Sequence, residues 1–335
     1  MRGMIAVILF TLLTALCWGV YGPVLHNGQH DMEGSSLRPF ICVGLAYFLI
    51  AVVVPLVLLK TRGEVGAWTF TGTVWSLVAG AAGALGALGI VLAFKFDGNP
   101  VYVMPLVFGG APVVNTFTTM YLTKTTKQAG PLFFAGLILV VAGAVTVLLF
   151  KPAGPGGKPG LFEMEFLDMA MVIGSILLTA FSWGVYGPIL HKGQMAMQGS
   201  RLRPLTCVGL AYFLIAVLAP AALLLGWNEP GSFTFSGSVW SLAGGAAGAI
   251  GALGIIMAFT FGGKPIYVMP LVFGLAPVIN TFTSLISKGN LNQVGVPFYA
   301  GLIIVIAGAV TVLLFAPKAA PHAPSKATGK KPVPA

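Results

Sequence analysis

Hydrophobic residues along this chain gather in stretches of about 20 residues that contain no charged side chain. A helix of about 20 apolar residues crosses the hydrocarbon core of a bilayer, because it rises 1.5 Å per residue. Ten such stretches are predicted, at 4–25, 39–59, 72–94, 101–122, 130–150, 169–190, 204–225, 237–259, 265–287 and 296–316. Charged residues all lie outside these stretches, as expected because burying a charge in the bilayer is costly. We therefore predict an all-α integral membrane protein with ten transmembrane helices.

The second half of the chain repeats the first. The segment Trp18–Pro23 (Trp-Gly-Val-Tyr-Gly-Pro) recurs at Trp183–Pro188, a step of 165 positions (183 − 18), and Cys42–Val52 recurs unchanged at Cys207–Val217 with the same step. Each half contains five of the predicted helices. We expect a first repeat at 1–150, a flexible linker at 151–168, a second repeat at 169–316 and a disordered basic tail at 317–335.

The odd number of helices in each half predicts that the two repeats are inverted. If every stretch crosses the membrane, the second repeat enters from the opposite side. The distribution of Lys and Arg supports this, because cytoplasmic loops are enriched in both residues. Of the 18 Lys and Arg residues, 13 fall on the N-terminal side: Arg2, Lys60, Arg62, Lys124, Lys127, Lys192, Arg201, Arg203, Lys264, Lys318, Lys326, Lys330 and Lys331. Both termini are therefore expected to be cytoplasmic.

Composition narrows the class of protein further. Hydrophobic residues make up 57% of the chain and charged residues 8%, against roughly 25% charged in a soluble domain. The net charge of +10 is scattered over loops and tail, so no nucleic-acid partner is expected. Cys17, Cys42 and Cys207 lie within the stretches and are interpreted as packing residues. No cofactor and no metal is expected.

The fourth helix of each repeat carries the first candidate site. Two prolines in each of these helices are predicted to break the helix and to leave main-chain carbonyls without a hydrogen-bond partner: Pro105, Pro112, Pro270 and Pro277. Asn115 and Asn280 follow about one turn later. An amide beside free carbonyls suits hydroxyl or amide groups of a substrate, although each Asn could instead bond a neighbouring helix. Paired broken helices in two halves are typical of a transporter binding site.

Aromatic and histidine residues form a second set of candidates. We propose substrate binding for these residues: Trp18, Trp183, Tyr21, Tyr186, Tyr102 and Tyr267. The alternative for Tyr21 and Tyr186 is an interfacial position, where Tyr is common. His26 and His191 are expected on opposite faces, with a gating or pH-sensing role or, alternatively, an ordinary interfacial one.

Glycine recurs every three residues in Gly80–Gly89 and in Gly245–Gly254. A dinucleotide-binding loop would need a preceding strand, whereas these glycines lie inside apolar stretches. Glycine lets helix backbones approach closely in lipid. We therefore predict that these two segments are helix-packing surfaces.

A Trp-Gly pair in the first helix, Ala111-Pro112-Val113 in the fourth and the glycine-rich closing helix Ala135–Gly143 resemble the drug/metabolite transporter superfamily (EamA-like). Within it, Trp-Gly-Val-Tyr-Gly-Pro is similar to the glucose/ribose/ureide permease branch. A basic residue often follows the first helix in the family, and His26 or His191 stands there in this chain. The resemblance implies a ten-helix transporter with both termini inside and a cavity lined by helices 1 to 4 and 6 to 9.

The expected function is that of a secondary transporter or permease that moves a small polar, neutral, sugar-like metabolite by alternating access. The alternatives are an exporter of hydrophobic or amino-acid-like metabolites and a non-transporting membrane scaffold. An enzyme is not expected, because no constellation of nucleophile, acid or metal ligands occurs within the stretches. The expected location is a bacterial inner (plasma) membrane, with the lipid bilayer and a small-molecule substrate as partners and homodimerisation left open.

Overall fold

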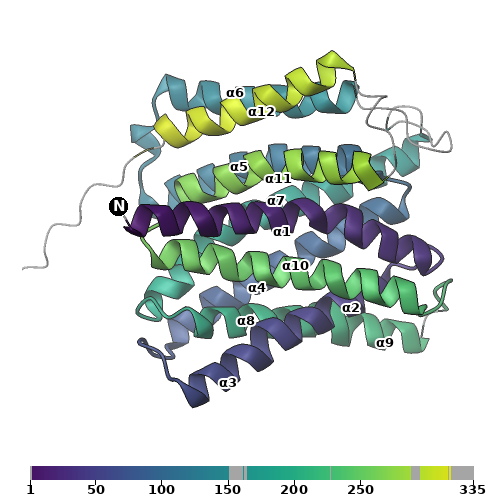
Figure 1. Cartoon of the computed structure of the whole chain (residues 1–335), viewed down its shortest axis with the longest axis horizontal. Coiled ribbons are helices and arrows are strands. Elements are labelled where there is room, and N and C mark those ends of the chain that lie inside the picture. The colour runs from purple at the N-terminus through teal and green to yellow at the C-terminus, as the bar shows by residue number, and fades with distance from the viewer. Residues whose placement is uncertain are drawn as a thin grey trace, which may run out of the picture.

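The computed structural model describes residues 2–150, 161, 164–226, 228–287, 295–315 and 317, so most of the expected linker and nearly all of the expected tail lie outside it. Its described residues form helices and no strand (Figure 1). The α-helices are α1 (Arg2–Asp31), α2 (Leu37–Phe48), α3 (Val54–Thr61), α4 (Phe70–Lys95), α5 (Pro100–Thr123), α6 (Pro131–Leu149), α7 (Phe166–Ala196), α8 (Leu202–Tyr212), α9 (Ala219–Gly226), α10 (Phe235–Thr260), α11 (Pro265–Ser287) and α12 (Val296–Phe315).

The helices follow the predicted apolar stretches. A π-helical segment, Leu49–Val53, joins α2 to α3, and Phe213–Leu218 joins α8 to α9, so each pair covers one predicted stretch. Within the described residues, eight helical stretches are long and apolar enough to cross a membrane, and α6 and α12 are shorter. These eight stretches indicate a multi-pass integral membrane protein.

Threonine caps fix where two of the long helices begin. The Oγ1 of Thr69 accepts a hydrogen bond from Gly72 N at 3.0 Å and donates to the carbonyl of Ala196 at 3.0 Å. The Oγ1 of Thr234 accepts from Gly237 N at 3.0 Å and donates to the carbonyl of Asp31 at 2.9 Å. A hydroxyl at this position satisfies an otherwise unpaired N–H of the first turn. Each cap therefore also ties the start of a helix to the end of a helix in the other half.

Equivalent helices of the two halves run antiparallel wherever they touch. Gly136 of α6 lies against Val312 of α12, and Gly143, further along α6, lies against Val305, further back along α12. The pairs α5 with α11 and α6 with α12 lie side by side in Figure 1. Helices α6 and α12, which are equivalent in the two halves, therefore run antiparallel to each other.

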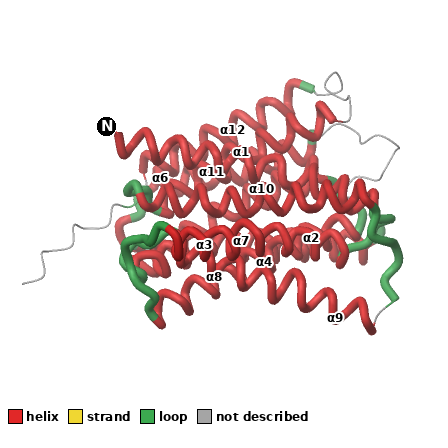
Figure 2. Tube along the Cα trace, turned by 60° about the horizontal axis from the view of Figure 1, so that its bottom comes forward, coloured by secondary structure: helices red, strands yellow, loops and turns green. Residues whose placement is uncertain are grey.

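The first helix of each half packs mainly against the other half. Helix α1 lies along α10 and α11, and α7 lies along α4 and α5. The connecting loops gather at the two ends of the helical bundle (Figure 2). As a result, the core of the bundle is a shared structure, in which neither half buries its long helices alone.

The glycine-rich segments are packing surfaces, as predicted. A Cβ atom at Gly245 would lie 2.7 Å from both the Cα and the carbonyl oxygen of Val43, and one at Gly80 would lie 2.7 Å from the Cα of Val208. These contacts are with main-chain atoms, which cannot move aside as a flexible side chain can. Helices α10 and α2, and likewise α4 and α8, therefore approach as closely as glycine allows.

Gly245→Ala is expected to lower the thermal stability of the protein in detergent, because overpacking of this kind costs about 1–3 kcal/mol. Gly174→Ala in α7 is the matched control, since a Cβ there meets no other atom within 4 Å. The control should leave the melting temperature unchanged or raise it slightly, because Ala favours a helix over Gly. Equal melting temperatures for both variants would contradict the close approach of α10 and α2.

Candidate functional site

A small chamber lined by aromatic rings lies at the centre of the bundle. Its volume is about 20 Å³, and equivalent residues of the two halves line it: Trp18, Tyr21, Tyr47, Gly83, Trp183, Tyr186, Tyr212 and Gly248. The Trp18 and Trp183 rings stack with their centroids 5.9 Å apart, and the Tyr47 and Tyr212 rings stack at 3.6 Å with an angle of 3° between their planes. None of these lining residues carries a charge. The chamber in this conformation has room for about one water molecule.

Main-chain carbonyls of the opposite half hold the two indole rings in place. Trp18 Nε1 donates to the carbonyl of Gly248 at 3.3 Å, and Trp183 Nε1 donates to the carbonyl of Gly83 at 3.2 Å. A buried indole N–H needs such an acceptor, since an unmade bond is costly. Both tryptophans, which the sequence nominated for substrate binding, therefore face the chamber in a fixed orientation.

The two tyrosines nominated with them bring unused hydroxyl groups to the chamber. Tyr21 and Tyr186 are each 3% exposed, and neither hydroxyl has a hydrogen-bond partner in the described structure. A buried hydroxyl without a partner costs about 1–3 kcal/mol. Such a group in a lined chamber is a natural point of contact for a ligand or a water molecule.

Tyr47 and Tyr212 complete the chamber, and sequence reasoning missed them. They lie inside the uninterrupted apolar repeat Cys42–Val52 and its copy, where they resemble ordinary packing residues. A Cβ atom at Gly83 would contact the Tyr212 ring, and one at Gly248 would contact the Tyr47 ring. The signal that could have identified them is this pairing of a tyrosine in the second helix with a glycine in the third helix of the other half.

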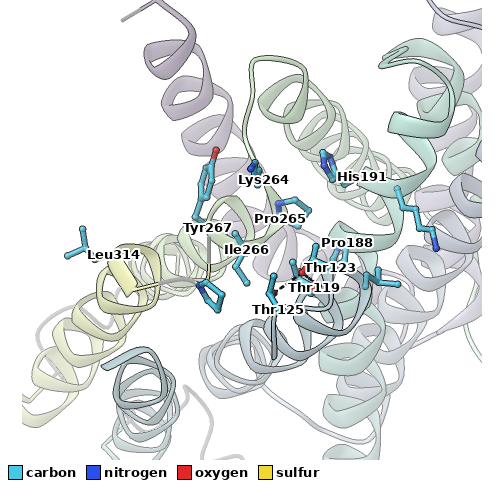
Figure 3. A pocket seen from close by; sticks show the side chains of 13 residues that line it. Thr119, Thr123, Thr125, Pro188, His191, Lys264, Pro265, Ile266, Tyr267 and Leu314 are labelled. Carbon is cyan, nitrogen blue, oxygen red and sulfur yellow. Dashed lines mark hydrogen bonds between the residues drawn. The ribbon is translucent and has the colours of Figure 1, made fainter. Parts of the chain in front are cut away.

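A second, larger cavity of about 650 Å³ lies at the end of the bundle where α5 and α7 end and α11 begins (Figure 3). Thr119, His191, Lys264 and Tyr267 are among the residues that line it. Tyr267 is partly exposed there, and its hydroxyl donates to the carbonyl of Gly262 at 2.8 Å. Its counterpart Tyr102 is 1% exposed. The two tyrosines therefore lie in different surroundings, and neither lines the aromatic chamber.

The two nominated asparagines bond neighbouring helices. Asn115 Nδ2 donates to the carbonyl of Pro265 at 3.2 Å, and Asn280 Nδ2 donates to the carbonyl of Pro100 at 3.1 Å. Each amide thus ties α5 and α11 together near one end. Both Oδ1 atoms are buried and have no partner in the described structure. One acceptor on each side chain therefore remains available, although neither asparagine is among the residues that line the aromatic chamber.

The expected break of the fourth helix at its prolines does not occur in the described residues. Helix α5 runs unbroken through Pro105 and Pro112, and α11 runs unbroken through Pro270 and Pro277. The prediction of a helix break was therefore wrong. A proline removes one hydrogen bond, and in a tightly packed bundle neighbouring helices keep the helix continuous despite that loss.

The two histidines lie at opposite ends of the bundle. The His26 ring meets the edge of Phe94 with centroids 5.1 Å apart, and the His191 ring meets Phe259 at 4.9 Å. His191 lines the larger cavity, and its Nδ1 is buried with no partner in the described residues. The two histidines are therefore equivalent in their packing, and the larger cavity borders one of them.

At each end of the bundle, a glutamate with a buried side chain links a loop of one half to the start of a helix in the other half. Neither glutamate was nominated from the sequence. The Glu64 carboxylate accepts from Ser200 Oγ at 2.6 Å, Arg201 N at 2.9 Å and Leu202 N at 3.1 Å. It thereby caps the start of α8 from the loop between α3 and α4. A carboxylate at a helix N-terminus is stabilised by the unpaired N–H groups and the helix dipole.

At the other end, Glu229 caps the start of α2 in the same way. Its carboxylate accepts from Ser35 Oγ at 2.6 Å and from Ser36 N at 2.9 Å. Arg38 forms an ion pair with Glu229 at 3.5 Å.

Glu64 pairs with two arginines, Arg201 at 2.8 Å and Arg203 at 3.8 Å. We call these two contacts the Glu64 latch and the Glu229 latch. The two latches could have been identified from the sequence, because each half has a glutamate and a Ser-x-x-Arg segment at equivalent positions.

No protein-family model matches the chain, and no curated protein matches it. Among solved structures, 21 chains are similar to this one. One of them, described only as a crystal structure of a protein, superimposes with a TM-score of 0.61 and is 19% identical in sequence, covering 92% of this chain and 96% of its own. At that identity the similarity shows a shared fold along nearly the whole chain and indicates no substrate.

The Glu64 latch predicts a loss of stability in acid. Burial alone would raise the pKa of Glu64, but hydrogen bonds from Ser200, Arg201 and Leu202 outweigh it and hold the pKa below its ordinary range. The stabilisation is therefore present above the unfolded pKa of about 4.3 and is lost as the pH falls through the lower folded value.

Glu64→Gln should lower the melting temperature at neutral pH, because charged hydrogen bonds of this kind contribute about 1.5–3 kcal/mol. It should also flatten the fall of the melting temperature between about pH 5 and pH 3. Glu33→Gln, which removes an exposed carboxylate, is the control and should keep the wild-type profile. A Glu64→Gln profile parallel to that of the wild type would refute the latch.

Proposed function

We propose that this protein is a secondary transporter or permease of the drug/metabolite transporter superfamily, built from two inverted five-helix repeats, with the aromatic chamber as its substrate site. The observation that carries the proposal is the chamber itself, because both halves contribute equivalent residues to one uncharged site at the centre of the bundle. Inverted repeats that share a central site are the typical architecture of secondary transporters.

The lining of the chamber favours a small, neutral and polar solute. Its tryptophan and tyrosine faces suit the C–H faces of a sugar-like ring, and the free hydroxyls of Tyr21 and Tyr186 suit the hydroxyl groups of such a solute. A charged solute would have no opposite charge among the residues that line the chamber. Its desolvation at the centre of the bundle would then be uncompensated.

The size of the chamber requires a conformational change for binding. A volume of about 20 Å³ excludes a sugar, so the stacked Trp18 and Trp183 rings must separate before a solute enters. The Glu64 and Glu229 latches bridge loops and helices at the two ends of the bundle. Opening one latch while the other stays closed would expose the chamber to one side of the membrane at a time, which is alternating access.

The rival within transport is an exporter of hydrophobic or amino-acid-like metabolites, because the same aromatic rings can pack against apolar solutes. For an apolar solute the unpartnered tyrosine hydroxyls would have no role in binding. Tyrosine-to-phenylalanine variants therefore separate the two substrate classes without changing the shape of the chamber.

Tyr21→Phe and Tyr186→Phe, alone and together, are tested for uptake of neutral sugars and of lipophilic solutes into proteoliposomes. For a hydroxyl-bearing substrate, the KM should rise about two- to tenfold per lost hydrogen bond, while the melting temperature stays unchanged or rises. Tyr121→Phe is the control, because Tyr121 is 79% exposed and is not among the residues that line the chamber. Wild-type sugar kinetics in the double variant would contradict the proposed site, and transport of no solute would favour the scaffold.

The inverted orientation is tested by labelling single cysteines at equivalent positions, in a background from which Cys17, Cys42 and Cys207 have been removed. Glu33→Cys and Gln198→Cys occupy matched exposed turns of the two repeats (198 − 33 = 165). An impermeant thiol reagent applied to intact cells should label Glu33→Cys only, because the positive-inside rule places Gln198 in the cytoplasm. Labelling of both positions from one side would overturn the inverted arrangement.

A further inference from the structure

The larger cavity at the end of α5, α7 and α12 carries cationic groups that the equivalent sequence positions of the other half lack. Lys264 and Lys192 border it, whereas Asn99 and Asn27 stand at the equivalent positions of the other half. Lys264 lies between Tyr267 and His191 in Figure 3. None of the lining residues is an aspartate or a glutamate. The cavity therefore offers positive charge with no opposing carboxylate on its walls.

Two residues of the cavity wall, Thr119 and His191, carry buried polar atoms without a partner in the described structure. Thr119 is 6% exposed, and its Oγ1 has no hydrogen-bond partner in the described structure. His191 Nδ1 is buried without a partner as well. Thr123 and Thr125, beside Thr119 in Figure 3, share a hydrogen bond of 2.8 Å. The Thr119 hydroxyl, the Lys264 ammonium group and, in the tautomer protonated at Nδ1, the His191 imidazole are donors of the kind that bind the oxygens of an anion.

Apolar side chains also line the cavity. Leu122, Ile266 and Leu314 line the cavity together with prolines. Lys192 places its Nζ over the Trp75 ring, 3.8 Å from the ring centroid, so Lys264 is the lining lysine that we assign to anion binding. The cavity thus joins a cationic, hydrogen-bonding side to an apolar side, within a volume of about 650 Å³.

We propose that this cavity binds an amphiphilic phosphate or carboxylate, with its anionic head at Lys264 and Thr119 and its apolar part against Leu122, Ile266 and Leu314. The site is separate from the aromatic chamber and does not depend on the proposed transport function. Loop lysines that only orient the protein in the membrane would need neither a cavity nor unpartnered buried donors beside them. The same head-group chemistry occurs in a soluble organic anion and in an anionic phospholipid.

Thermal unfolding of the full chain in a neutral detergent tests the proposal with three added probes. Inorganic phosphate tests the head alone, hexyl phosphate tests head and apolar part together, and dihexanoyl phosphatidylglycerol, compared with dihexanoyl phosphatidylcholine, tests a lipid source. Stabilisation of the wild type should be saturable and should need lower concentrations of hexyl phosphate than of inorganic phosphate, because the apolar part adds buried area.

Lys264→Asn is the central variant, because Asn99 shows that this fold accepts asparagine there. Asn99 Oδ1 caps the next helix by accepting from Val101 N at 3.0 Å, so the substitution should not weaken folding. Binding of hexyl phosphate should weaken about tenfold or more on loss of the charged hydrogen bond. Lys95→Thr is the matched control: it also replaces a lysine by the residue at the equivalent position, Thr260, but at an exposed site outside the cavity lining.

Thr119→Val supplies a readout that a structural role would not give. Removing a buried, unpartnered hydroxyl should leave the melting temperature unchanged or raise it, while weakening hexyl phosphate binding severalfold.

Stabilisation by hexyl phosphate alone would identify a soluble anion, and stabilisation by phosphatidylglycerol but not phosphatidylcholine would identify a lipid. Both results support the site. No saturable stabilisation by any anionic probe, or equal weakening in Lys264→Asn and Lys95→Thr, would overturn it.

Discussion

Two indole rings lying against two glycines hold the centre of this bundle together. In apolar surroundings the N–H groups of Trp18 and Trp183 need acceptors, and helix carbonyls of the opposite half provide them. The indoles fit there because a Cβ atom at Gly251 or Gly86 would overlap them. The tryptophan stack, the tyrosines around it and the crossing of the first and third helices all follow from this close approach.

Much of the fold could be predicted from the sequence, because a membrane imposes one dominant pattern. Apolar stretches without charge located the helices, and α4 at Phe70–Lys95 lies within two residues of the predicted 72–94 at each end. Helices α1 and α7 continue past the predicted ends, to Asp31 against 25 and to Ala196 against 190, because their last turns are polar and lie beyond the apolar stretch. The periodic glycines marked helix contacts correctly, since little else explains glycine inside a long apolar helix. The constant offset in residue number between the two halves also indicated that any central site would be built from pairs of equivalent residues.

The site was predicted only in part, because its other half depends on contacts far apart in the chain. Trp18 and Tyr21 are rare residue types within their stretch, whereas Tyr47 belongs to a run that reads as ordinary packing. The Glu64 latch joins residues 137 positions apart, and a glutamate in a loop gives no local sign of such a partner. The prediction of a helix break at the prolines was wrong for a related reason. Each proline removes a main-chain hydrogen bond, as its local sequence indicates, but packing against neighbouring helices keeps the helix continuous.

The unequal latches have a thermodynamic consequence. Among the described residues, Glu64 pairs with two arginines and Glu229 with one, so the two ends of the bundle need not cost the same free energy to open. In the transport cycle that we propose, and without an energy source, such a difference would determine on which side the empty site rests and how tightly solute appears to bind from each side. It leaves the final concentration ratio across the membrane unchanged, because an intrinsic bias of the carrier does no work.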